Sequence, residues 1–138
     1  MELLFNGVVN VIGVPWGLFY MWYNIKNELI KKVSKMDKKE ILKYLETHKS
    51  KLQKDGIVSI GLFGSFAKES ADKDSDIDIL IETSDAFINK YRGWDAFIYI
   101  DENIREKISN KFHKKVDIFD KNSNSSIKEE ILKDVCYA

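Results

Sequence analysis

The sequence predicts an α+β fold in which a small sheet is flanked by helices. Short apolar or alternating runs are typical of strands, and longer segments whose apolar residues recur every three or four positions are typical of helices. The length of 138 residues suits one domain with a real core rather than two domains of ordinary size. The predicted order is helix, strand, short helix, strand, helix, strand, helix, without internal repeats. The pattern alone does not decide which strands run parallel.

The first 35 residues differ from the rest of the chain. Residues 3–25 carry no charged side chain and are numerous enough to cross a bilayer, and four lysines follow by position 35. Asparagines, glycines and Pro15 interrupt the run and disfavour a spanning helix. Three alternatives stay open: translation that begins at Met36, a packed or peripheral segment, and a membrane anchor. We therefore divide the chain into a hydrophobic segment, 1–35, and a domain over residues 36–138.

The first half of this domain predicts a helix, a strand and a short helix. An aspartate at position 37 and a glutamate three residues later form a start like a capping box, and the helix is expected to end before Gly56. Residues 57–63 form an apolar, β-branched run bounded by glycines, as in a buried strand. A turn at Gly64 then leads into a short helix through Ala67. The apolar stripe expected on the first helix is Ile41, Leu42, Leu45 and Leu52.

The second half predicts two strands and two helices. Residues 76–81 alternate acidic and aliphatic side chains in the period of a strand, and residues 115–119 form a third strand. Residues 87–93 have no clear pattern. One helix is expected to carry a continuous apolar stripe of Phe97, Ile100, Ile104, Ile108 and Phe112. The last helix is expected to open at Ser126 with Glu129 and to carry Ile127, Ile131, Leu132 and Val135 on one side.

Three aspartates in these strands form a candidate metal site. Asp76 and Asp78 are two residues apart in a strand, so their carboxylates leave the same face. Two like charges at that distance are unfavourable unless a cation lies between them, and an all-oxygen pair suits Mg²⁺. Asp117 lies between two aliphatic residues of the third strand, from which its carboxylate can leave the same sheet face. The single cysteine, Cys136, excludes an internal disulfide and a cysteine metal site, which suits a reducing cytoplasm.

A phosphate site is expected next to these acids. Gly64 ends the first strand, where a missing side chain lets phosphate approach the backbone. Ser65 offers a hydroxyl at the start of a helix whose free amides attract anions. Lys68, one turn later, can add positive charge. The segment has neither the ending of a Walker loop nor the spaced glycines of a dinucleotide fingerprint.

Each of these residues also has a structural interpretation. Gly64 alone fits a turn, Ser65 an ordinary N-cap, and alternating aspartates the solvated face of an edge strand. The joint spacing of the glycine and serine with the two aspartates favours a site instead. His48 and His113 lack the neighbours of a ligand or general base, and Cys136 fits a small apolar filler.

The spacing resembles the signature of the DNA-polymerase-β-type nucleotidyltransferase superfamily. Gly64-Ser65, ten intervening residues and Asp76-x-Asp78 carry this resemblance, with Asp117 as the third acid. The surrounding segments are similar to those of its minimal members, the MNT proteins, over roughly residues 37–137. The resemblance implies a polymerase-β-like fold with a small mixed sheet. Residues 83–110 look longer than a minimal member needs, and the hydrophobic start has no counterpart.

The resemblance also implies roles for these residues. Asp76 and Asp78 would bind Mg²⁺, and Gly64 and Ser65 would hold the triphosphate of ATP. Asp117 would complete the metal site and help to activate the acceptor hydroxyl. Many MNT proteins, the MntA-like antitoxins, are paired with a HEPN-domain ribonuclease toxin and transfer AMP from ATP to a tyrosine of that toxin.

The leading expectation is therefore a Mg²⁺-dependent antitoxin that adenylylates a HEPN toxin in the cytoplasm. One alternative is an adenylyltransferase of small hydroxylated molecules, of the aminoglycoside type, and another is a non-catalytic protein that masks a toxin. The chain has 22 basic and 22 acidic residues, so no net charge attracts it to nucleic acid. Direct nucleic-acid binding is not expected.

Overall fold

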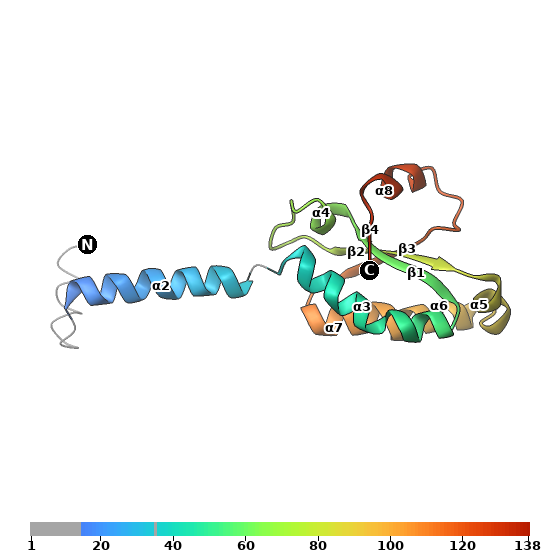
Figure 1. The fold of residues 1–138 in the computed structure, drawn as a ribbon, viewed down its shortest axis with the longest axis horizontal. Coiled ribbons are helices and arrows are strands. Elements are labelled where there is room, and N and C mark those ends of the chain that lie inside the picture. The colour runs from blue at the N-terminus through green and yellow to red at the C-terminus, as the bar shows by residue number, and fades with distance from the viewer. Residues whose placement is uncertain (1–14, 35) are drawn as a thin grey trace. The chain divides into compact units, whose positions relative to one another are not determined.

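The computed structural model describes residues 15–34 and 36–138, which fall into two compact units (Figure 1). The first unit lies within residues 1–36 and contains helix α2, Trp16–Ser34. Within the described ranges, no helix combines the length and the apolar character needed to cross a membrane. Residues 3–14 of the uncharged run lie outside the described part of the chain. The second unit, Asp37–Ala138, carries the predicted site.

A four-stranded mixed sheet with the order β3-β2-β1-β4 forms the centre of the second unit. β1 (Ile57–Phe63) pairs antiparallel with β2 (Ile77–Thr83) and with β4 (Cys136–Tyr137). β2 also pairs in parallel with β3 (Val116–Asp120). The predicted α+β fold with a small mixed sheet and flanking helices is confirmed.

The helix that precedes the sheet covers one of its faces, on the same side as the helices of the long connection between β2 and β3 (Figure 1). This helix, α3 (Lys38–Lys54), begins where the Asp37 carboxylate accepts a hydrogen bond of 2.9 Å from the backbone N–H of Glu40. Three residues of its predicted stripe are buried, while Leu42 is only half-buried. They pack with the aliphatic residues of the two central strands to form the core, which includes Ile41, Leu45, Leu52, Ile57, Ile60, Leu62, Ile77, Ile79, Leu80 and Ile81.

The connection between β2 and β3 is not the single helix with a continuous apolar stripe that the sequence predicted. It contains α5 (Asp85–Lys90), α6 (Trp94–Ile100), a π-helical turn η1 (Asp101–Arg105) and α7 (Glu106–Phe112). A π-helical turn is wider than an α-helical one, so it rotates the residues before it relative to those after it. The predicted stripe is therefore broken at its first member: Phe97 is 49% exposed, whereas Tyr99, Ile104 and Ile108 are buried.

The C-terminal segment differs from the expectation at both of its ends. Helix α8 spans Lys128–Asp134 and has no side-chain cap, so the predicted start at Ser126 is wrong. Val135 is extended rather than helical and leads into the two-residue strand β4, which contains Cys136. A Cβ at Gly61 would lie 2.9 Å from Val135 Cγ2 and 3.0 Å from the Cys136 carbonyl oxygen. The missing side chain thus lets β4 approach the centre of β1.

Candidate active site

The predicted aspartates come together where β2 and β3 begin. Asp78 and Asp117 are direct neighbours in the parallel register of the two strands. Asp76 lies just before β2, and the next residue, Ile77, donates its backbone N–H to the Lys115 carbonyl oxygen at 2.9 Å. Two adjacent strands thus present the three acids at one end of the sheet.

The turn after β1 brings backbone directly against one of these acids. Phe63, the last residue of β1, is the register partner of Asp78, and the short helix α4 (Gly64–Ala67) follows at once. Gly64 has φ +69°, a conformation that L-residues rarely adopt. A Cβ at Gly64 would lie 2.2 Å from Asp78 Oδ2. Only glycine fits here, and its absent side chain leaves the start of α4 next to the carboxylate.

The Asp78 carboxylate is placed for a cation. Burial raises its pKa, and the neighbouring charges of Asp117 and Asp76 raise the pKa further. Within the described residues it has no hydrogen-bond or ion-pair partner. Desolvation and like charges both oppose its ionisation, and a bound cation would relieve both.

A lysine already lies between the other two acids. Lys115 Nζ is 3.8 Å from Asp76 Oδ2 and 3.8 Å from Asp117 Oδ1. The side chains of Lys115, Asp76 and Asp117 are 71%, 40% and 54% exposed, so these ion pairs are weak and a divalent ion could replace the ammonium group. In the described part of the chain, no three His, Cys, Asp or Glu side chains already surround one metal position. The acids therefore fit Mg²⁺ that takes few protein ligands and completes its shell with water and phosphate.

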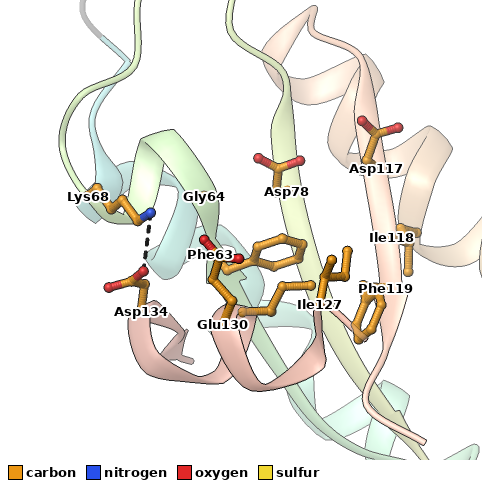
Figure 2. Close-up of a pocket in the computed structure, with 11 residues that line it drawn as sticks. Phe63, Gly64, Lys68, Asp78, Asp117, Ile118, Phe119, Ile127, Glu130 and Asp134 are labelled. Atoms are coloured by element: carbon orange, nitrogen blue, oxygen red, sulfur yellow. Dashed lines mark ion pairs between the residues drawn. The ribbon is translucent and has the colours of Figure 1, made fainter. Parts of the chain in front are cut away.

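A pocket of about 430 Å³ opens beside these acids (Figure 2). Its volume is in the range of small-molecule sites. Gly64, Asp78 and Asp117 line it, and side chains of α8 project into the same space (Figure 2). The rings of Phe63 and Phe119 meet edge to face there, with centroids 6.4 Å apart. The remaining lining residues are Lys68, Ile118, Ile127, Glu130, Ile131 and Asp134.

The two other predicted phosphate ligands are placed less directly. Ser65 lies in α4 but does not line the pocket, and its carbonyl oxygen accepts the backbone N–H of Ser70 at 2.9 Å. Lys68 lines the pocket, where its Nζ is 3.2 Å from Asp134 Oδ2 (Figure 2). Both side chains of this pair are largely exposed, so the contact is weak and leaves the ammonium group able to reorient.

The sequence analysis did not predict that helix α8 and the rings of Phe63 and Phe119 line the pocket. The amphipathic pattern of the last helix predicted its apolar residues, but not that Glu130 and Asp134 face the same pocket as Asp78. Nothing in a single sequence indicates such a contact, because it depends on how α8 packs beside α4 and β1.

Residues 39–136 match the family described as "Polymerase beta, Nucleotidyltransferase". The chain belongs to this family and is a nucleotidyltransferase, as its glycine turn and paired strand acids predict. It is 36% identical over 101 residues to a protein of Methanocaldococcus jannaschii named "Putative protein adenylyltransferase". The match covers 71% of this chain and 94% of that protein.

A solved structure shows the same fold. A structure titled "Structure of putative minimal nucleotidyltransferase" matches with a TM-score of 0.55 and 21% identity, over 74% of this chain and 96% of that one. A second, titled "Crystal structure of the toxin-antitoxin with AMP-PNP", matches with a TM-score of 0.45 and 26% identity, over 67% and 70% of the two chains. The second likeness is too distant to support any inference about function.

Proposed function

We propose that this nucleotidyltransferase is a Mg²⁺-dependent protein adenylyltransferase that transfers AMP from ATP to a hydroxyl group of a partner protein. The observation that carries the proposal is the contact of the Gly64 backbone with Asp78, beside Asp117 in one pocket. The archaeal relative, of which this chain covers nearly the whole length, is named for a protein acceptor. That name supports AMP as the transferred group.

In this reaction the acceptor oxygen attacks the α-phosphorus of ATP. The new O–P bond forms as the bond from the α-phosphorus to the bridging oxygen breaks, and pyrophosphate leaves with that electron pair. Asp117, half-exposed beside the pocket, takes the hydroxyl proton. Asp76, Asp78 and Asp117 would hold Mg²⁺, which lowers the pKa of an attacking hydroxyl and neutralises charge on the leaving oxygens.

The turn after β1 holds the triphosphate in this proposal. The first N–H groups of a helix are not used within it and bind phosphate oxygens, and Gly64 leaves them uncovered by a side chain. Ser65 adds a hydroxyl group, and the Lys68 ammonium group leaves its ion pair with Asp134 to bind a phosphate oxygen. The residues thus contribute mainly by position and charge.

The acceptor that we infer is a tyrosine of a HEPN-domain ribonuclease toxin, which makes this chain a cytoplasmic antitoxin. The support is the resemblance of the glycine turn and the acids to those of MNT proteins. The absence of net charge agrees with a protein acceptor rather than a nucleic acid. A neighbouring gene for a small helical protein with an Arg-x₄-His motif would identify the partner to test.

The test is transfer of labelled AMP from α-labelled ATP to that partner in the presence of Mg²⁺. Asp78→Asn and Asp117→Asn should abolish transfer without unfolding the protein. Glu82→Gln is the matched control, because Glu82 is an acid of the same strand whose carboxylate bonds Ser59 and Lys121 away from the pocket. Transfer that persists in Asp78→Asn would contradict the proposal. Full toxin neutralisation by Asp76→Asn would instead favour masking.

A further inference from the structure

Lys114 ties together the segments that form the site. Its Nζ donates hydrogen bonds to the carbonyl oxygens of Lys73, at 2.9 Å, and Ser75, at 3.0 Å. Ser75 is the residue directly before Asp76. The same ammonium group lies 5.7 Å from the ring centroid of Phe66, which is buried in α4. One half-buried side chain therefore contacts the loop before β2 and the helix after β1.

Asp76 needs such support because it lies outside the ladder of β2. On its C-terminal side, the backbone N–H of Ile77 is held by the Lys115 carbonyl oxygen. On its N-terminal side, the carbonyl group of Ser75 is held by Lys114. The two neighbouring peptide groups of Asp76 are thus both fixed by the two residues directly before β3, Lys114 and Lys115.

The loop itself is a tight polar turn that the lysine closes. Asp72 accepts hydrogen bonds from the Asp74 backbone N–H at 2.9 Å and from the Ser75 hydroxyl at 3.0 Å. These bonds and the charge of Lys114 lower the pKa of the Asp72 carboxyl. The hydrogen bonds of Asp72 lie inside the turn. Among the described residues, the only hydrogen bond from another segment to the Ser75 carbonyl oxygen comes from Lys114.

We infer that Lys114 is a positioning residue: it holds the Asp76 carboxylate where that carboxylate can bind the divalent ion. The inference rests on the proposed function, because it takes Asp76 as a metal ligand. Residues that orient a metal ligand without touching the metal typically change affinity about 10- to 100-fold when they are replaced. Loss of the Lys114 ammonium group should therefore weaken divalent-ion binding about tenfold.

Whether loss of Lys114 weakens or strengthens divalent-ion binding distinguishes a positioning role from a purely electrostatic one. Lys114 is a cation near a cation site, so removal of its charge alone would strengthen metal binding. Positioning predicts the opposite. Lys111→Met is the matched control: Lys111 is an exposed lysine at the end of α7 and, among the described residues, makes no hydrogen bond or ion pair with the loop before β2. Its loss removes the same charge and should leave metal affinity unchanged or slightly raise it.

The experiment titrates each folded protein with Mn²⁺ alone, a paramagnetic substitute for Mg²⁺, and follows the free ion by electron paramagnetic resonance. Lys114→Met keeps an unbranched side chain but removes the ammonium group, and it should raise the dissociation constant about tenfold. Lys114→Arg, which can donate to both carbonyl groups, should stay within about threefold of wild type. Circular dichroism confirms the folded fraction, and Lys114→Leu, which also has no donor, replaces the methionine variant if that variant does not fold.

Asp76→Asn in the same titration separates this inference from the proposed function. Wild-type binding that is lost in Asp76→Asn, together with wild-type affinity in Lys114→Met, would overturn the role of Lys114 alone. A lower melting temperature of Lys114→Met without a change in Mn²⁺ affinity would likewise show a purely structural lysine. Absence of Mn²⁺ binding by the wild-type protein would contradict the proposed function, and the positioning role with it.

Discussion

Gly64 and Asp78 touch so closely that no side chain fits between them: a Cβ on Gly64 would lie 2.2 Å from Asp78 Oδ2. The contact joins a backbone turn, which can take phosphate, to an acid, which can take a metal ion. A nucleotide bound with its metal ion needs both within one pocket, and both line it here. The positive φ of Gly64 and the register of Phe63 with Asp78 together produce this geometry.

Gly64→Ala should therefore cost more than an unfavourable backbone conformation. Gly93 is the control, because it also has a positive φ, +56°, but a Cβ there meets nothing within 4 Å. Gly93→Ala should lose roughly 1–3 kcal/mol of unfolding free energy from the backbone alone, because φ +56° and ψ −114° are strained for an L-residue. Gly64→Ala should lose more than Gly93→Ala, because Asp78 must also move. Urea denaturation measures both, and equal losses would mean that the carboxylate moves aside freely.

The same variant should lose AMP transfer. Displacement of Asp78 by about 1 Å can reduce a rate roughly 100-fold. Initial rates of transfer, measured on folded Gly64→Ala and Gly93→Ala, should differ by at least tenfold in favour of Gly93→Ala. Comparable rates would show that the turn does not need to approach Asp78 during the reaction.

Asp78→Asn should be at least as stable as wild type at neutral pH, although it is inactive. Burial and the charges of Asp117 and Asp76 raise the pKa of Asp78 in the folded state. A raised pKa means that the stability contributed by the protonated form is present below the unfolded pKa, about 4, and is lost as the pH rises through the folded pKa. The ionised carboxylate thus opposes folding at pH 7, and the asparagine variant lacks this penalty.

Thermal melting at pH 7 and near pH 3.5 checks this expectation. The melting temperature of Asp78→Asn should exceed that of wild type by a few degrees at pH 7, and the difference should disappear in acid. Added Mg²⁺ should raise the melting temperature of wild type and not that of the variant. A variant that melts lower than wild type at pH 7 would show that the carboxylate has a stabilising partner.

The two aspartates of β3 should respond in opposite ways. Asp120 accepts hydrogen bonds from the Thr83 hydroxyl at 2.6 Å and from the Asn122 backbone N–H at 3.0 Å, so it fastens the end of β3 to β2. Asp120→Ala should lose about 1–3 kcal/mol of unfolding free energy and keep its transfer rate per folded molecule. Asp117→Asn should keep its stability and lose transfer. Denaturation and transfer assays on both variants would show whether these roles are instead exchanged.

Tyr99→Phe should weaken the protein in a pH-dependent way. The Tyr99 hydroxyl donates a 2.6 Å hydrogen bond to Asp55 Oδ2, which is the main reason that the pKa of Asp55 is lowered. A lowered pKa gives stability that is present above the unfolded pKa and lost as the pH falls through the folded pKa. The variant should lose on the order of 1 kcal/mol at pH 7 and progressively less below about pH 4.

Tyr44→Phe is the control for this measurement. The Tyr44 hydroxyl donates to the Lys107 carbonyl oxygen at 3.2 Å, an acceptor that does not titrate. Denaturation at pH 7 and pH 3 should therefore give one constant loss for Tyr44→Phe and a shrinking loss for Tyr99→Phe. Parallel behaviour of the two variants would mean that the charge of Asp55 adds nothing to the Tyr99 bond.

Local chemistry explains which parts of the fold were predictable. The bounds of β1, Ile57–Phe63, agree with the prediction because glycines flank a β-branched run, and α3 begins at the predicted cap. The π-helical turn η1 changed the buried face of the long connection, and no residue pattern indicated it. β4, with two residues, is too short to show any periodicity.

The residues of the candidate site could be proposed from the sequence, but their arrangement could not. The spacing of Gly64 and Asp78 indicated a common role, whereas their close approach depends on the antiparallel register of β1 with β2. The Lys115 ammonium group between Asp76 and Asp117, and the Lys68 contact with Asp134, depend on how distant elements pack. Contacts of long, flexible charged side chains produce no periodic pattern in the sequence from which they could be predicted.

The parallel pairing of β2 with β3 also has a consequence for the order of folding. Asp78 and Asp117 become neighbours only after the whole connection between these strands has found its place on the sheet. Pairing of segments far apart in the chain has a high entropic cost and is intrinsically slow. The hairpin of β1 and β2, joined by a short segment, can form earlier with Gly64 already beside Asp78. We therefore expect nucleotide binding to appear late in refolding, only after β3 has paired with β2.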